Sequence, residues 1–176
     1  KPIGAHPYQR EKKAIRIEHS TSRNAISFFE VIERFQGFAS VRVKPKTGRT
    51  HQIRVHMAHI GCSVLCDRLY SGRAKLRLHD LTRKNQDQLI LLERQALHAH
   101  HIKFKHPIDG HEMSISAPIP DDIKKTEQAI REFRAISWSS PSRTSASKGP
   151  TLAIFKTDTN ERNFYPKRSV RDLQTF

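Results

Sequence analysis

Apolar and polar positions alternate along two neighbouring segments in the first third of the chain. Residues 28–35 are rich in aromatic and β-branched side chains, and residues 38–44 place a small apolar residue at every second position. A period of two predicts β-strands, and Gln36-Gly37 between the segments predicts a turn. We therefore expect an antiparallel hairpin with one apolar face and one basic face.

The period changes in the segment that follows this hairpin. Residues 45–50 contain a proline and a glycine that end the strand, and Thr50 is a suitable helix N-cap. Residues 51–60 fit a short helix that ends at Gly61, with an apolar face formed by Ile53, Met57 and Ile60. The first sixty residues thus predict a hairpin followed by an amphipathic helix.

A second hairpin and a last helix are predicted further along the chain. Residues 96–106 and 113–116 alternate on either side of Asp109-Gly110, a strong hairpin turn signal. Residues 62–70 are expected to form a short buried strand that leads into a turn. The last helix is expected to be capped by Asp121 or Asp122, with Ile123, Ile130 and Phe133 on one face.

The composition changes after Trp138. Residues 139–148 are rich in serine, and residues 151–176 have scattered aromatic side chains without a period. We therefore divide the chain into one folded domain, residues 1–136, and a linker with a poorly defined tail, residues 137–176.

The charge of the chain points to a polyanionic partner. Thirty-two Lys and Arg residues against 17 Asp and Glu residues give a net charge of +15. Nucleic acid is the first candidate, and a basic surface that only favours solubility is the alternative. No apolar stretch approaches the ~20 residues of a membrane span, so no membrane partner is expected. Two cysteines cannot build a disulfide scaffold, which favours a cytoplasmic location.

The strand-to-helix segment, residues 44–56, holds the candidate chemistry. Its basic side chains surround a predicted helix N-terminus, where backbone N–H groups and the helix dipole favour phosphate oxygens. The residues predicted to bind nucleic acid are Lys44, Lys46, Arg49, Thr50, His51 and Gln52. The alternative is a strand-to-helix connection that is basic without binding anything.

Arg54 occupies a different position from these residues. It lies about 100° around the predicted helix from Ile53, at the edge of the apolar face. An arginine there needs a carboxylate or a set of carbonyl groups as its partner. The alternative is a side chain that extends into water.

Two motifs, in this order, are similar to those of the RluA-type RNA pseudouridine synthases. The first is Thr47-Gly48-Arg49-Thr50-His51-Gln52-Ile53-Arg54-Val55-His56, continued by Asp67-Arg68-Leu69-Tyr70. The second is Arg94-Gln95-Ala96-Leu97-His98-Ala99, followed by His106-Pro107. The resemblance covers roughly residues 2–136. It implies an α+β fold with a mixed, mainly antiparallel sheet flanked by helices, of which this chain is expected to be only the C-terminal part.

The resemblance also implies an activity. The family isomerises uridine to pseudouridine in structured RNA, ribosomal or transfer, without a cofactor or a metal ion. A catalytic aspartate acts on a nucleotide that is flipped out of the RNA. The arginine that pairs with this aspartate matches Arg54, which is therefore the expected catalytic residue, as the ion-pair partner of an aspartate absent from this chain.

The chain departs from the family pattern in one major respect. The His-Arg-Leu-Asp motif that contains the catalytic aspartate does not occur in the 176 residues. Arg77-Leu78-His79-Asp80 is only superficially similar, and it follows the first motif instead of preceding it. The chain starts with Lys1 and is expected to be a fragment that is inactive alone. The alternative is a non-catalytic RNA-binding remnant of the family.

Two cysteines raise the question of a metal site. Cys62 and Cys66 are spaced C-x3-C, and a zinc ion held with His98, His100 and His101 is conceivable. The spacing is not that of a standard zinc finger, so buried free thiols and no metal site are expected. Asp67 is expected only to cap a turn, and His98 to be structural.

Overall fold

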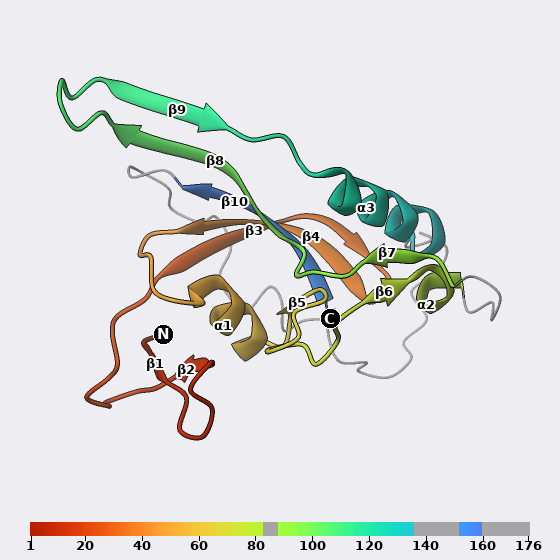
Figure 1. Ribbon diagram of the computed structural model, residues 1–176, viewed down its shortest axis with the longest axis horizontal. Helices are drawn as coiled ribbons and strands as arrows, with labels where there is room; N and C mark the ends of the chain where they lie inside the picture. Colours follow the sequence, from red (N-terminus) through yellow and green to blue (C-terminus); the bar gives the residue numbers. More distant parts are fainter. Residues whose placement is uncertain (83–87, 136–151, 160–176) are drawn as a thin grey trace, which may run out of the picture.

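The computed structural model describes residues 1–82 and 88–135 and the backbone of residues 152–159. A six-stranded mixed sheet dominates it, in the order β3-β4-β10-β8-β9, with β5 paired to one end of β10 (Figure 1). The strands of this sheet are β3 (Ser27–Phe35), β4 (Phe38–Pro45), β5 (Ser63–Val64), β8 (Leu97–Lys105), β9 (Glu112–Ser116) and β10 (Leu152–Thr159). The predicted α+β class is confirmed.

Both predicted hairpins are present in the sheet. β3 and β4 pair antiparallel around Gly37, whose φ of 80° suits a tight turn that a residue with a side chain rarely adopts. β8 and β9 pair antiparallel with Ile102 opposite Ile115. The predicted buried strand at residues 62–70 is shorter than expected, because only Ser63 and Val64 have strand geometry.

β10 was not predicted, and it lies at the centre of the sheet. It pairs parallel with β4 on one side and with β8 on the other (Figure 1). In the described part of the sheet, β10 makes all the parallel pairings, whereas the two hairpins are antiparallel. A central parallel strand does not need to alternate in polarity, so the sequence of residues 152–159 carries no period that identifies it.

Helix α1 (Gln52–His59) packs on the hairpin formed by β3 and β4. Met57 is buried with Val41 and Val43, and Ile53 and Ile60 pack against the same cluster, as the predicted apolar face requires. The predicted cap, Thr50, is wrong, because the N-cap is His51. Among the described side chains, none makes a capping hydrogen bond to this helix.

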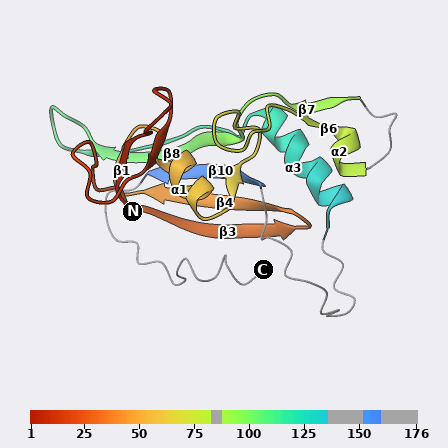
Figure 2. The ribbon, with the colours of Figure 1, turned by 90° about the horizontal axis from the view of Figure 1, so that it is seen from below.

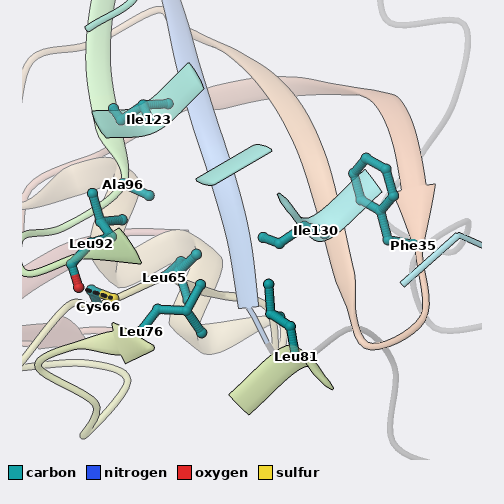
Figure 3. Close-up of a cluster of buried hydrophobic side chains, with 9 residues drawn as sticks. All are labelled: Phe35, Leu65, Cys66, Leu76, Leu81, Leu92, Ala96, Ile123 and Ile130. Atoms are coloured by element: carbon teal, nitrogen blue, oxygen red, sulfur yellow. Dashed lines mark hydrogen bonds between the residues drawn. The ribbon is translucent and has the colours of Figure 1, made fainter. Parts of the chain in front are cut away.

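A second core lies under helix α3 (Asp121–Phe133). Ile123 and Ile130 are fully buried against the side chains of α2 (Leu78–Thr82), β6 (Leu76–Arg77) and β7 (Ile90–Leu92), as Figure 3 shows. The predicted caps, Asp121 or Asp122, are one and two residues off, since Pro120 is the N-cap. Phe133, which the sequence predicts on the buried face, is 41% exposed, because it ends the helix beyond the packed turns.

The N-terminal segment contains two strands that the sequence did not predict. β1 (Ile3–Ala5) and β2 (Lys13–Ile15) pair antiparallel, and Ile3 is buried against Val55 of α1. Strands this short have too few residues for a period of two to stand out. In the described part of the chain, no helix is long and apolar enough to cross a membrane.

Candidate functional site

A buried ion pair links helix α1 to the turn that follows β5. The guanidinium of Arg54 binds the carboxylate of Asp67 through two hydrogen bonds, Nε to Oδ2 at 2.6 Å and Nη2 to Oδ1 at 2.7 Å. The side chain of Arg54 is 12% exposed and that of Asp67 is 0% exposed. The hydrogen bond to Asp67 raises the pKa of Arg54, so the guanidinium stays charged.

The position of Asp67 is set by its own turn. Its Oδ1 accepts hydrogen bonds from the backbone N–H groups of Leu69 (3.1 Å) and Tyr70 (3.3 Å). Asp67 therefore caps a turn, as predicted, and is also the carboxylate that Arg54 requires. The sequence predicts a different partner for Arg54, a catalytic aspartate outside the chain. That aspartate, as a second partner beside Asp67, stays a prediction.

Tyr70 completes the surroundings of Arg54. The Cζ atom of Arg54 lies 4.9 Å from the centre of the Tyr70 ring, a distance suited to a cation–π contact. The Tyr70 hydroxyl accepts a hydrogen bond from the backbone N–H of Lys13 at 2.9 Å and lies 3.0 Å from Nδ1 of His51. Sequence reasoning missed Tyr70, although it lies three residues after Asp67 in the first motif.

His51 joins this cluster to the basic loop. Its backbone is left-handed, with φ 56°, which costs a residue with a side chain about 1–2 kcal/mol. Desolvation, followed by the charge of Arg54, lowers the pKa of His51, so its ring is neutral at neutral pH. The side chain thus acts as a hydrogen-bonding group toward Tyr70.

The loop formed by residues 46–51 is held by the amide of Gln52. Its Oε1 accepts hydrogen bonds from Thr47 Oγ1 (2.7 Å) and from the backbone N–H of Arg49 (3.0 Å). Its Nε2 donates to the Ile26 carbonyl and to Ser27 Oγ, both at 2.9 Å. Gln52 is only 4% exposed, so its polar atoms are occupied in shaping the loop.

The other residues predicted to bind RNA differ in exposure. Lys46, Arg49 and Thr50 are exposed around the N-terminus of α1, which no described side chain caps. Lys44 and His51 are half-buried. The structure therefore brings three exposed polar groups to a helix N-terminus, and keeps Gln52 beneath them.

The two cysteines lie in the interior, as expected. Both are free and buried, and burial raises the pKa of each thiol to about 11. Cys66 lies in the core under α3, and its Sγ faces the Leu92 carbonyl (Figure 3). Cys62 belongs to the other cluster, with Met57. Inert thiols in two separate cores confirm the prediction of buried free cysteines.

Comparison with known proteins gives a consistent result. The family described as RNA pseudouridylate synthase matches residues 3–59. A protein named ribosomal large subunit pseudouridine synthase D from Xanthomonas campestris is 40% identical over 134 residues, which are 76% of this chain and 39% of the relative. Proteins of the same name from Vibrio cholerae and Pseudomonas aeruginosa are 38% and 39% identical over 75% and 76% of this chain, and 40% of each relative.

The chain spans about two fifths of the length of these relatives. The family match includes the helix that carries Arg54, and together with these relatives it confirms the family resemblance. Over the aligned three quarters of its length, this chain belongs to the family of RNA pseudouridine synthases.

Proposed function

We propose that this chain is the part of a cytoplasmic RNA pseudouridine synthase that supplies the arginine partner of the catalytic aspartate and a basic surface for RNA. The observation that carries the proposal is the buried, doubly hydrogen-bonded Arg54–Asp67 pair beside an exposed basic loop. The names of the relatives favour RNA of the large ribosomal subunit as the substrate, with transfer RNA as the other candidate.

The guanidinium of Arg54 has capacity for a second carboxylate. It carries five N–H donors, and Asp67 uses one on Nε and one on Nη2. We propose that an aspartate outside these 176 residues binds the remaining edge and acts on the flipped-out uridine. In that reaction the glycosidic N1–C1′ bond breaks, the uracil turns, and a C5–C1′ bond forms in its place, while C5 loses its proton and N1 gains one. Arg54 orients the aspartate and keeps it ionised.

The RNA backbone is proposed to lie over the N-terminus of α1. Lys46, Arg49 and Thr50 contribute exposed charge and a hydroxyl there, with Lys44 on the adjoining strand. Gln52 lies beneath this surface and holds the loop, and His51 contacts Tyr70. The net charge of +15 supports a polyanionic ligand.

Catalysis is tested in protein made from the complete coding sequence, by measuring pseudouridine formation in large-subunit ribosomal RNA. Arg54→Ala is expected to remove most turnover while RNA affinity stays within about twofold, because Arg54 is buried below the binding surface. Arg54→Lys is expected to restore little, since lysine lacks the planar fork that binds two carboxylate oxygens. Near-normal turnover of Arg54→Ala contradicts the ion-pair role.

The coding sequence upstream of Lys1 separates the two proposed forms of the protein. An in-frame His-Arg-Leu-Asp segment supports the enzyme, of which this chain alone is expected to be inactive. A stop codon next to Lys1 supports the alternative, a non-catalytic RNA-binding remnant.

RNA binding by the chain itself is tested by its salt dependence. Affinity for a structured ribosomal RNA fragment should fall steeply with salt, because each neutralised phosphate releases counterions. Lys46→Ala and Arg49→Ala are each expected to lower the log–log slope by about 1. Lys125→Ala, an exposed residue of α3, is the matched control and should leave the slope unchanged. An affinity that does not vary with salt contradicts the proposal.

A further inference from the structure

The turn between β8 and β9 extends beyond the rest of the sheet in both views (Figure 1, Figure 2). Its backbone is closed by hydrogen bonds from the His106 N–H to the His111 carbonyl (2.8 Å) and from the Gly110 N–H to the His106 carbonyl (3.0 Å). Gly110 has φ 72°, which allows the chain to reverse within this loop. The loop therefore has a defined shape, although its side chains are exposed.

Three potential metal ligands converge inside this loop. One ligand atom each of His106, Asp109 and His111 lies within 4.8 Å of the other two. Asp109 Oδ1 is 2.9 Å from Nδ1 of His106 and 2.5 Å from Nδ1 of His111. The two imidazole rings stack with their centres 4.8 Å apart.

Nδ1 of His106 is the least satisfied atom of the group. It is buried from solvent and makes no aligned hydrogen bond in the described structure, although Asp109 Oδ1 is close. A nitrogen of this kind can offer its lone pair to a metal ion without giving up a hydrogen bond.

We propose that His106, Asp109 and His111 form a binding site for one divalent metal ion of the zinc class. Two imidazole nitrogens and one carboxylate oxygen are a ligand set that zinc accepts, with the fourth position open to water. Among the described residues, this is the one group of three or more such side chains with a suitable geometry. It lies apart from the cysteines that the sequence singled out.

The loop must adjust to accept the ion, because the two imidazole rings are stacked at an interplanar angle of 19° and must turn before both Nδ1 atoms face one point. Tetrahedral ligands with bonds of about 2.0–2.1 Å lie about 3.3 Å from one another. Asp109 Oδ1 must therefore withdraw from His111 by less than about 1 Å, which rotation of an exposed side chain provides.

The alternative is a turn held only by its hydrogen bonds, with Asp109 accepting from the His111 N–H. The metal proposal does not rest on the proposed RNA activity, because its residues belong to neither the Arg54 cluster nor the basic loop. A failed metal test leaves the proposed RNA activity intact, and a failed activity test leaves the metal proposal intact.

Titration of the chain with zinc chloride at neutral pH, followed by calorimetry, tests the proposal. We expect one ion per chain, with affinity reduced at least about tenfold in His106→Ala, His111→Ala and Asp109→Asn. His19→Ala is the matched control, an exposed histidine whose Nδ1 contacts Thr21 Oγ1, and it should bind zinc as the wild type does. Absence of binding, or binding that all three hairpin variants retain, overturns the proposal.

Nuclear magnetic resonance of the histidine side chains gives a second readout that does not depend on the variants. Zinc is expected to shift the Nδ1 resonances of His106 and His111 and to leave those of His19 unchanged. Shifts confined to other histidines contradict the site.

Discussion

Two arginine–aspartate pairs in this chain share one geometry at the scale of single residues, and differ in burial. Arg54 binds Asp67, and Arg94 binds Asp122, each through Nε and Nη2. The side chains of Arg54 and Asp67 are 12% and 0% exposed, whereas those of Arg94 and Asp122 are 45% and 39% exposed. Solvent screens the second pair, so the two should differ strongly in their effect on stability.

Replacing Asp67 with asparagine tests this difference directly. The amide side chain of Asp67→Asn would keep an oxygen for the backbone N–H groups of Leu69 and Tyr70, but would leave the buried Arg54 charge unpaired. The free energy of unfolding should fall by about 3 kcal/mol. Asp122→Asn, the matched exposed pair, should cost under about 1 kcal/mol. Urea denaturation of both variants measures their free energies of unfolding. Equal losses of stability contradict the effect of burial on the ion pair.

Helix α1 is the element on which the site depends, and it carries several histidines. Desolvation is the main cause that lowers the pKa of His51, His56 and His59 below the ordinary value of 6.5. In the folded protein these rings therefore stay neutral at a pH where the unfolded chain already binds protons. The contribution of these neutral rings to the free energy of unfolding is complete above pH 6.5, the ordinary pKa. It is lost as the pH falls below 6.5 toward the lowered pKa values of the folded protein.

The protein should therefore be less stable at about pH 5.5 than at about pH 7.5. His56 is the clearest contributor, because it is half-buried with Nδ1 3.0 Å from Ser27 Oγ. His56→Gln should flatten the pH dependence of the unfolding free energy, and His19→Gln, at an exposed position, should not. Denaturant titrations at both pH values measure the effect. A steeper dependence in His56→Gln has the wrong sign for this mechanism.

At the scale of the whole molecule, the sheet depends on a strand from the end of the chain. In the part of the chain that the structure describes, β10 supplies every strand pairing between the β3–β4 hairpin and the β8–β9 hairpin. The β3–β4 hairpin carries the helix with Arg54, and the β8–β9 hairpin leads to the core under α3. Removing β10 leaves two inner strand edges unpaired, which is costly and favours aggregation.

A chain that ends at residue 151 should lose cooperative unfolding, because the two hairpins are no longer joined. A chain that ends at Thr159 keeps β10 and is the matched control. Thermal denaturation followed by circular dichroism, together with binding of a dye for exposed apolar surface, distinguishes the two. Equal cooperativity in both truncated chains contradicts a central role for β10.

Local pattern identified the elements whose neighbours in space are also neighbours in sequence. The alternation in residues 28–44 and the turn at Asp109-Gly110 were enough to predict both hairpins, and the spacing of Ile53, Met57 and Ile60 was enough to predict α1. Thr50 and Asp121, which the sequence predicts as helix caps, each lie one residue from the observed N-cap. Their side chains favour a cap position, but local preference does not fix the boundary to a single residue.

The sequence by itself determined that Arg54 lies at the edge of an apolar helix face, where a carboxylate or a set of carbonyl groups must pair with it unless it extends into water. Only the tertiary structure decided that Asp67 meets this need, that Tyr70 covers the pair, and that β10 joins the two hairpins. These contacts join residues far apart in the chain. Their energy comes from burial and charge pairing that exist only after folding, so no local period records them.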